Sequence, residues 1–238
     1  MMNQWKYAPF LILTLTLVTC NGIEKKENTP MSEPQTEVSG TIQDGYRILP
    51  IKLDGNPATY TIYRGDYVKF LLDDGDNPQT DYHFQVPDLA VNTTLSDTIV
   101  ALPFFKMKVP GEYPFTLGNV TGVFNVIELE QANYAEVSNS ETEELLNSDY
   151  PPFLLDVRTP GEFRQAYIEG AELIPLQNLQ QRLAELEKYK NHPILIYCAT
   201  GNRSTTAAKI LLDNGFKNVK NVRAGIFGWA QDGYPIVR

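Results

Sequence analysis

A short loop, Cys198–Ser204, joins an apolar segment to a helical one and constrains the fold of the C-terminal half more than any other stretch. Residues 193–197 are typical of a buried strand, and residues 204–212 are typical of a helix. A strand that runs directly into a helix is characteristic of α/β folds with a parallel sheet. In such sheets ligands bind beyond the carboxyl ends of the strands, where Cys198 lies.

The predicted position of Cys198 favours the thiolate, which is the nucleophilic form of the side chain. Backbone N–H groups and the positive end of the following helix converge there, and Arg203 adds a nearby positive charge. We therefore expect a charged sulfur that is reachable from solvent. We expect Ser204 and Thr205 to cap the helix. The loop residues predicted to cradle the sulfur are Ala199, Thr200, Gly201, Asn202 and Ser204.

The rest of residues 131–238 alternates between strand-like and helix-like segments. A strand is expected within 131–139, followed by a helix from Ser140 with a capping box to Glu143. The further predicted strands are 153–156, 173–174, 194–197 and 219–222, and the further predicted helices are 162–166, 179–188 and 204–214. This alternation predicts a mostly parallel sheet with both faces covered.

At the cysteine loop the chain resembles the rhodanese family of sulfurtransferases. Residues 155–163 match the family's D-V-R-x-x-x-E-F segment, residues 168–171 its I-P-G-A turn, and residues 198–204 its active-site loop. Residues 224–229 stand where the family usually has G-G-x-x-x-W. The chain departs from the family at Ala166-Tyr167, which replace Gly-His, at Glu169, which replaces a proline, and at Ala224, which replaces a glycine.

The resemblance implies an enzyme, without a cofactor, that carries sulfane sulfur on Cys198 as a persulfide. It moves the sulfur from a donor such as thiosulfate to a thiol or cyanide acceptor. Ala199 weakens the case for thiosulfate, because thiosulfate-using relatives often carry a basic residue at that position. Arg203, the second expected catalytic residue, either points at the donor's oxyanion or braces the loop against a carboxylate. Asp156 and Arg158 are expected to support the site as a structural ion pair rather than to transfer protons.

Two alternatives to sulfur transfer remain open from the sequence. Phosphatases and arsenate reductases also hold an anion in a cysteine loop, but their C-x5-R spacing gives a wider bowl than the C-x4-R spacing of Cys198 and Arg203. The other alternative is a non-catalytic sulfur-binding, sensing or interaction protein. The presence of Cys198, Gly201 and Arg203 together weighs against it.

Residues 38–130 are predicted to form an all-β sandwich, because short alternating runs at 60–63, 67–72 and 122–127 are separated by turn clusters. Segments 64–68, 83–87 and 109–115 resemble landmarks of the cupredoxin fold. A sandwich of this kind would serve as a spacer or as a docking module for a protein partner that the sequence does not identify.

A blue-copper site needs two histidines and a cysteine thiolate, usually with a methionine. His83 stands at the first histidine position, but the segment after Tyr113 supplies none of the remaining ligands. No metal is therefore expected, and His83 is interpreted as a hydrogen-bonded scaffold residue. The acidic residues 73–77, with Asp81, lack the spacing of a calcium loop and are interpreted as solvated.

The N-terminal segment predicts export to a bacterial cell envelope. Residues 8–18 are apolar but too few to span a bilayer, and residues 1–20 are interpreted as a signal peptide. Leu17–Cys20 resembles a lipobox, with Thr19 departing from it, so Cys20 is the predicted lipidation site. An ordinary secretory signal is the alternative. Residues 21–37 are predicted to be a disordered tether that holds the folded part, facing the periplasm, away from the membrane surface.

The charge of the chain argues against nucleic acid as a partner. The formal net charge is −9, and it is spread along the sequence without a basic patch. The partners that the resemblance implies are a small sulfur donor and a thiol acceptor. The lipobox-like segment adds a membrane, through the lipid.

Overall fold

The structure is a computed structural model, and it describes residues 37–73, 81–96 and 105–238. The predicted signal peptide, the lipidation site Cys20, nearly all of the tether and most of the acidic loop lie outside the described residues. Residues 37–238 form one compact unit. Among the described residues, no helix is long and apolar enough to cross a bilayer.

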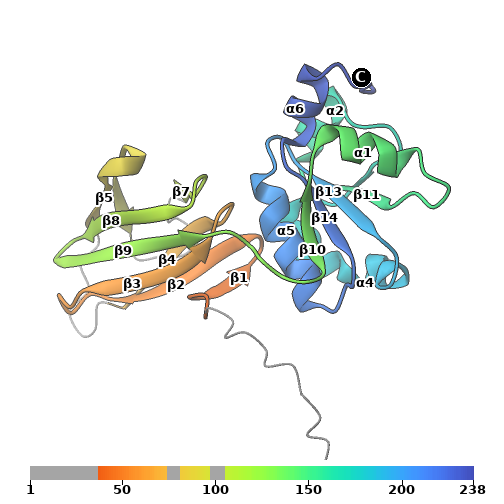
Figure 1. Cartoon of the computed structure of the whole chain (residues 1–238). Helices are drawn as coiled ribbons and strands as arrows, with labels where there is room; N and C mark the ends of the chain where they lie inside the picture. Colours follow the sequence, from red (N-terminus) through yellow and green to blue (C-terminus); the bar gives the residue numbers. More distant parts are fainter. Residues whose placement is uncertain (1–36, 74–80, 97–104) are drawn as a thin grey trace, which may run out of the picture. The chain divides into compact units, whose positions relative to one another are not determined.

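The N-terminal part is built from two β-sheets, as Figure 1 shows. One sheet has the order β1-β2-β4-β7, and its strands are Thr41–Gln43, Tyr46–Lys52, Tyr67–Asp73 and Phe105–Lys106 in that order. The other has the order β3-β9-β8-β5-β6, and its strands are Ala58–Tyr63, Val120–Ile127, Gly111–Leu117, Asp81–Val86 and Val91–Ser96. The 3-10 turn η1, Pro87–Leu89, joins β5 to β6. The β-rich N-terminal region predicted from the sequence is therefore present.

Both sheets contribute alternate residues to one aromatic core, which is the pattern that a two-sheet sandwich requires. Phe70 comes from the first sheet, whereas Phe84, Phe115 and Phe124 come from the second, and all four are nearly completely buried. Phe115 and Phe124 stack with their ring centroids 4.5 Å apart. His83 lies between the buried Tyr82 and Phe84 on β5, so its side chain points outward and is exposed. It was interpreted as a hydrogen-bonded residue of the scaffold, and this exposed position gives no support to that interpretation.

The C-terminal part contains the predicted parallel sheet. Its order is β10-β14-β13-β11-β12, and every neighbouring pair is parallel. The strands in that order are Tyr134–Val137, Val219–Val222, Ile194–Tyr197, Phe153–Asp156 and Glu172–Leu173. Figure 1 shows β10, β14, β13 and β11 running side by side.

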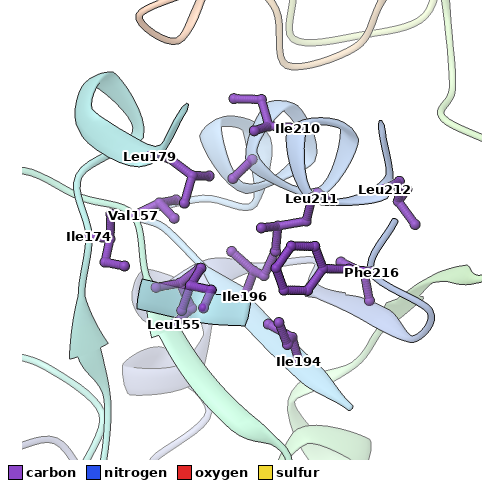
Figure 2. Close-up of a cluster of buried hydrophobic side chains, with 14 of the residues drawn as sticks. Leu155, Val157, Ile174, Leu179, Ile194, Ile196, Ile210, Leu211, Leu212 and Phe216 are labelled. Atoms are coloured by element: carbon purple, nitrogen blue, oxygen red, sulfur yellow. The ribbon is translucent and has the colours of Figure 1, made fainter. Parts of the chain in front are cut away.

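Apolar clusters cover both faces of this sheet, because its central strands are buried on both sides. On one face, Ile194 and Ile196 pack with Leu211 of α5 and with Phe216, as Figure 2 shows. On the other face, Leu195 packs with residues of α6 and α1. The helices are α1 Asn139–Leu146, α2 Pro160–Gln165, α3 Leu176–Leu179, α4 Leu183–Leu186, α5 Asn202–Asp213 and α6 Gly225–Gln231.

Two local predictions about the helices need correction, and one helix was missed. The capping box of α1 is formed by Ser138 and Glu141 rather than by Ser140 and Glu143, because β10 ends at Val137 and the helix starts directly after it. The helix predicted over 179–188 is instead a series of short turns, α3, η2 (Gln180–Arg182), α4 and η3 (Glu187–Tyr189). Helix α6 was not predicted.

Candidate active site

Cys198 lies at the point where β13 ends, directly before the loop that opens α5. Its side chain is only 1% exposed, and it belongs to the apolar cluster on the α5 face of the sheet. The expectation that the sulfur is openly reachable is therefore wrong for this conformation. The sulfur nevertheless has a polar neighbour, since the hydroxyl of the fully buried Ser204 donates a hydrogen bond to Sγ over 3.6 Å.

Gly201 shapes the loop in a way that no other residue can. Its φ is +80°, and a Cβ there would lie 2.0 Å from the backbone oxygen of Arg223. The same residue is the N-cap of α5, and no side chain caps the helix. The prediction that Ser204 and Thr205 cap α5 is therefore wrong, because the helix begins at Asn202 and both residues lie inside its first turn. The Thr205 hydroxyl instead donates to the Gly201 carbonyl over 3.0 Å.

The first turn of α6 holds the other side of the loop. The amide of Ile226 donates to the Cys198 carbonyl over 2.9 Å, and the amide of Phe227 donates to the Ala199 carbonyl over 3.1 Å. A Cβ at Gly225 would lie 2.5 Å from the Cys198 carbonyl oxygen, so glycine is needed for this close approach. The loop is thus held by backbone contacts that sequence reasoning did not identify.

Arg203 does not point freely into the site. Its Nη1 and Nη2 atoms donate to the two carboxylate oxygens of Glu162 over 2.8 and 2.6 Å. This pair joins α5 to α2, where Glu162 also closes the capping box with Thr159. The hydrogen bonds from Arg203 lower the pKa of Glu162 to about 2. Of the two roles left open for Arg203, this geometry is that of a brace.

Asp156 and Arg158 form a buried ion pair at the end of β11. Nε of Arg158 lies 2.9 Å from one carboxylate oxygen of Asp156, and the Arg158 amide donates to the other over 2.8 Å. The guanidinium also donates to the Ala166 carbonyl over 2.7 Å and lies over the ring of Tyr197, the residue before Cys198. This is the buried ion pair expected from the sequence, and its role as framework rather than as a proton shuttle stays a prediction.

Two sandwich residues near the sulfur, Tyr67 and Lys106, were not identified from the sequence. Tyr67 packs against the apolar cluster that includes Cys198, and the Lys106 Nζ lies 5.3 Å from the centre of the Tyr67 ring. Burial lowers the pKa of Lys106, whereas a negative charge on Cys198 raises it. The sequence contained one indirect indication of a basic residue from elsewhere in the chain. Ala199 is uncharged, so the loop itself has no basic residue at that position.

No metal centre is assembled by the residues that the structure describes. Within residues 37–73, 81–96 and 105–238, no group of three or more His, Cys, Asp or Glu side chains is placed to hold a metal ion.

Comparison with known proteins places this site in a recognised family. The model of the rhodanese-like domain matches residues 138–232. A sulfurtransferase of Allochromatium vinosum is 34% identical over 102 residues, which are 43% of this chain and 94% of that protein. The thiosulfate sulfurtransferase PspE of Escherichia coli is 36% identical over 67 residues, which are 28% of this chain and 64% of that protein.

Solved structures also match part of the chain. A crystal structure of a rhodanese-related protein from Thermoplasma volcanium is 31% identical, with a TM-score of 0.39, and the match covers 44% of this chain and 98% of that one. The match to the Allochromatium sulfurtransferase spans almost that whole protein, and residues 138–232, which the family model matches, include the cysteine loop described above. Through residues 138–232, the chain belongs to the rhodanese-like family.

Proposed function

We propose that the protein is a sulfurtransferase that carries sulfane sulfur on Cys198. The observation that carries the proposal is the position of this thiol at the start of a twelve-residue helix, with the Ser204 hydroxyl 3.6 Å from its sulfur. The helix N-terminus and the hydroxyl both stabilise negative charge, which the thiolate and the persulfide share.

The reaction has two steps, and each forms one bond to the transferred sulfur atom and breaks another. The Cys198 thiolate attacks the outer sulfur of a donor such as thiosulfate, and the sulfur–sulfonate bond breaks with its electron pair leaving on sulfite. An acceptor thiolate or cyanide then attacks the outer sulfur of the persulfide. The Cys198–sulfur bond breaks and the thiolate is restored, so neither step needs a cofactor.

The arrangement of Arg203 favours sulfur transfer over phosphatase or arsenate reductase chemistry. An oxyanion-binding arginine has to present its donors to the substrate, whereas the Nη1 and Nη2 atoms of Arg203 are engaged by Glu162. The short C-x4-R loop points the same way. Transfer of a single sulfur atom needs no second binding site for a tetrahedral oxyanion at the cysteine.

A second candidate is a protein that stores or senses sulfur without efficient turnover, and the 1% exposure of Cys198 favours it. To separate the two, the protein is incubated with thiosulfate and the mass of the peptide containing Cys198 is measured. Cyanide or a thiol is then added. The transferase is supported if the peptide gains one sulfur atom, loses it to the acceptor, and does so repeatedly. Storage is supported if the peptide gains one sulfur atom but no repeated transfer to the acceptor follows. Hydrolysis of an aryl phosphate would support the phosphatase alternative.

For the remaining parts of the chain, we propose export and lipid anchoring through Cys20, and a cupredoxin-like sandwich that has lost its copper ligands. The lipobox-like residues 17–20 support the first proposal, and the two-sheet architecture supports the second. Labelling with a radioactive fatty acid that is abolished in Cys20→Ser would support the anchor, whereas equal labelling of both proteins would contradict it.

A further inference from the structure

The β-sandwich touches the sulfur site through the turn between β3 and β4. The carbonyl of Gly65 in this turn accepts a hydrogen bond from the Thr206 hydroxyl of α5 over 3.2 Å. The φ of Gly65 is +99°, and a Cβ there would lie 2.3 Å from the backbone oxygen of Asn202. The turn therefore approaches the first residue of α5 at backbone distance.

A buried arginine fixes this contact. Arg64 is 0% exposed, and its guanidinium donates to the Asn202 side chain over 3.0 Å and to Glu128 over 2.7 Å. A third bond goes to Glu136 on β10. Arg64 belongs to the sandwich turn and Asn202 to α5, so this hydrogen bond crosses the contact between them. The sandwich is thus a fixed neighbour of the loop that carries Cys198.

Beyond the turn, two side chains of the sandwich lie at or next to the cluster that includes Cys198. Tyr67 packs against the cluster that includes Cys198, and β7 places Lys106 directly opposite Tyr67 in the sheet register. Both side chains are partly buried. The charge on Cys198 contributes to the pKa of each, which is consistent with their closeness to the sulfur.

Arg203 and Lys106 are two positive charges near the loop, and they differ in their pairing with carboxylates. Arg203 is paired with Glu162. Among the ion pairs within residues 37–73, 81–96 and 105–238, none includes Lys106. The lysine side chain carries a compact charge on a flexible stem, so its ammonium group can bind an anion at the edge of the site and move with it toward the sulfur.

We propose that the sandwich completes the sulfur site, with Tyr67 and Lys106 forming its entrance and Lys106 binding the negative group of the incoming sulfur compound. The site would then select small anionic donors. Lys106 of the sandwich would supply the positive charge that Ala199, in the cysteine loop, does not. This inference rests on the proposed function only for the identity of the donor. The anion-binding entrance itself can be tested without sulfur transfer.

The test compares alkylation of Cys198 by iodoacetate, an anion, and by iodoacetamide, which is neutral. Both reagents attack the same thiolate, so the ratio of their rate constants cancels any change in thiolate fraction. Modification is followed on the tryptic peptide 191–203 of the full chain, which excludes Cys20. The variants are Lys106→Met, which keeps the apolar stem, Lys106→Arg, which keeps the charge, and Lys108→Met, an exposed control on the same segment.

We expect Lys106→Met to lower the iodoacetate-to-iodoacetamide ratio on the order of tenfold, because a fixed positive charge raises the local concentration of anions. Lys106→Arg should retain most of the ratio, and Lys108→Met should leave it unchanged. An unchanged ratio in Lys106→Met, or an equal fall in Lys108→Met, would overturn the proposal. Failure of both reagents to reach Cys198 in the folded wild-type protein would overturn it as well.

Sulfur loading in the same variants separates this inference from the proposed function. If Lys106→Met loses the anion preference but the wild-type protein gains no sulfur from thiosulfate, the entrance stands and the transferase assignment fails. If the wild-type protein transfers sulfur and Lys106→Met does so with an unchanged KM for thiosulfate and an unchanged alkylation ratio, the transferase stands and the entrance fails.

Discussion

The two carboxylate oxygens of Glu162 hold the Nη1 and Nη2 atoms of Arg203, at 2.8 and 2.6 Å, and so join α2 to the first turn of α5. The pair fixes the end of the loop that begins at Cys198. It also engages two of the guanidinium N–H groups that could otherwise bind a substrate oxyanion.

Glu162→Gln is expected to destabilise the protein in a pH-dependent way. The pKa of Glu162 is about 2 in the folded protein against a usual 4.5, so its charge stabilises the fold above pH 4.5 and this contribution disappears as the pH falls toward 2. We expect a loss of about 1 kcal/mol at pH 7, well below the full value of the shift, because solvent screens a carboxylate that is one-third exposed. Urea unfolding at pH 7, 5 and 3 measures it.

The control for this prediction is Glu185→Gln, which removes a carboxylate from the exposed pair with Arg182. It should leave the free energy of unfolding unchanged within error at every pH. If Glu162→Gln lowered the free energy of unfolding as much at pH 3 as at pH 7, the stabilisation that it removes would not come from the charge of the carboxylate.

Gly65→Ala is expected to disturb the contact between the sandwich and α5. The new Cβ would lie 2.3 Å from the Asn202 backbone oxygen, and the φ of +99° is itself unfavourable for alanine. Steric overlap with backbone has no easy relief, so we expect a loss of about 2–4 kcal/mol. Thermal and urea unfolding of the full chain measure the loss.

Gly170→Ala provides the matched comparison, since its φ is +81° and nothing lies within 4 Å of the new Cβ. It should cost only about 1 kcal/mol, from backbone conformation alone. Equal losses in the two variants would mean that the approach of Gly65 to Asn202 contributes nothing to stability.

Ser204→Ala is expected to make Cys198 less reactive. The variant removes the hydroxyl 3.6 Å from the sulfur without adding bulk to a fully buried position. A hydrogen bond to a charged acceptor stabilises it, so the iodoacetamide rate at pH 7 should fall about fivefold. Ser148→Ala, an exposed serine in the same domain, serves as the control and should have the wild-type rate. A wild-type rate in Ser204→Ala would show that the hydroxyl does not support the thiolate.

Sequence reasoning located the strands and the cysteine loop because these depend on local composition. Residues 153–156 and 194–197 are short and mostly apolar, residues 219–222 begin and end with valine, and all three segments are strands of the parallel sheet. The glycine requirement at Gly201 was also visible, although its physical reason, the approach to the Arg223 carbonyl, comes from a residue distant in the sequence.

The contacts that complete the site were not predictable from local patterns. Glu162 faces Arg203 only because α2 and α5 converge, 41 positions apart in the sequence. Arg64 reaches Asn202 across 138 positions, and neither residue carries a motif that announces the pair. The burial of Cys198 likewise results from packing between elements, so the loop motif alone suggested a more open sulfur than the structure has.

The central claim is that Cys198 accepts and releases one sulfur atom, and the mass of the protein tests it directly. Wild-type protein and Cys198→Ser are incubated with thiosulfate, analysed by mass spectrometry, and analysed again after cyanide is added. The account predicts that the wild-type peptide 191–203 gains the mass of one sulfur atom, loses it to cyanide as thiocyanate, and that Cys198→Ser gains nothing. A wild-type peptide that remains unmodified, or a Cys198→Ser protein that is loaded equally, would contradict it.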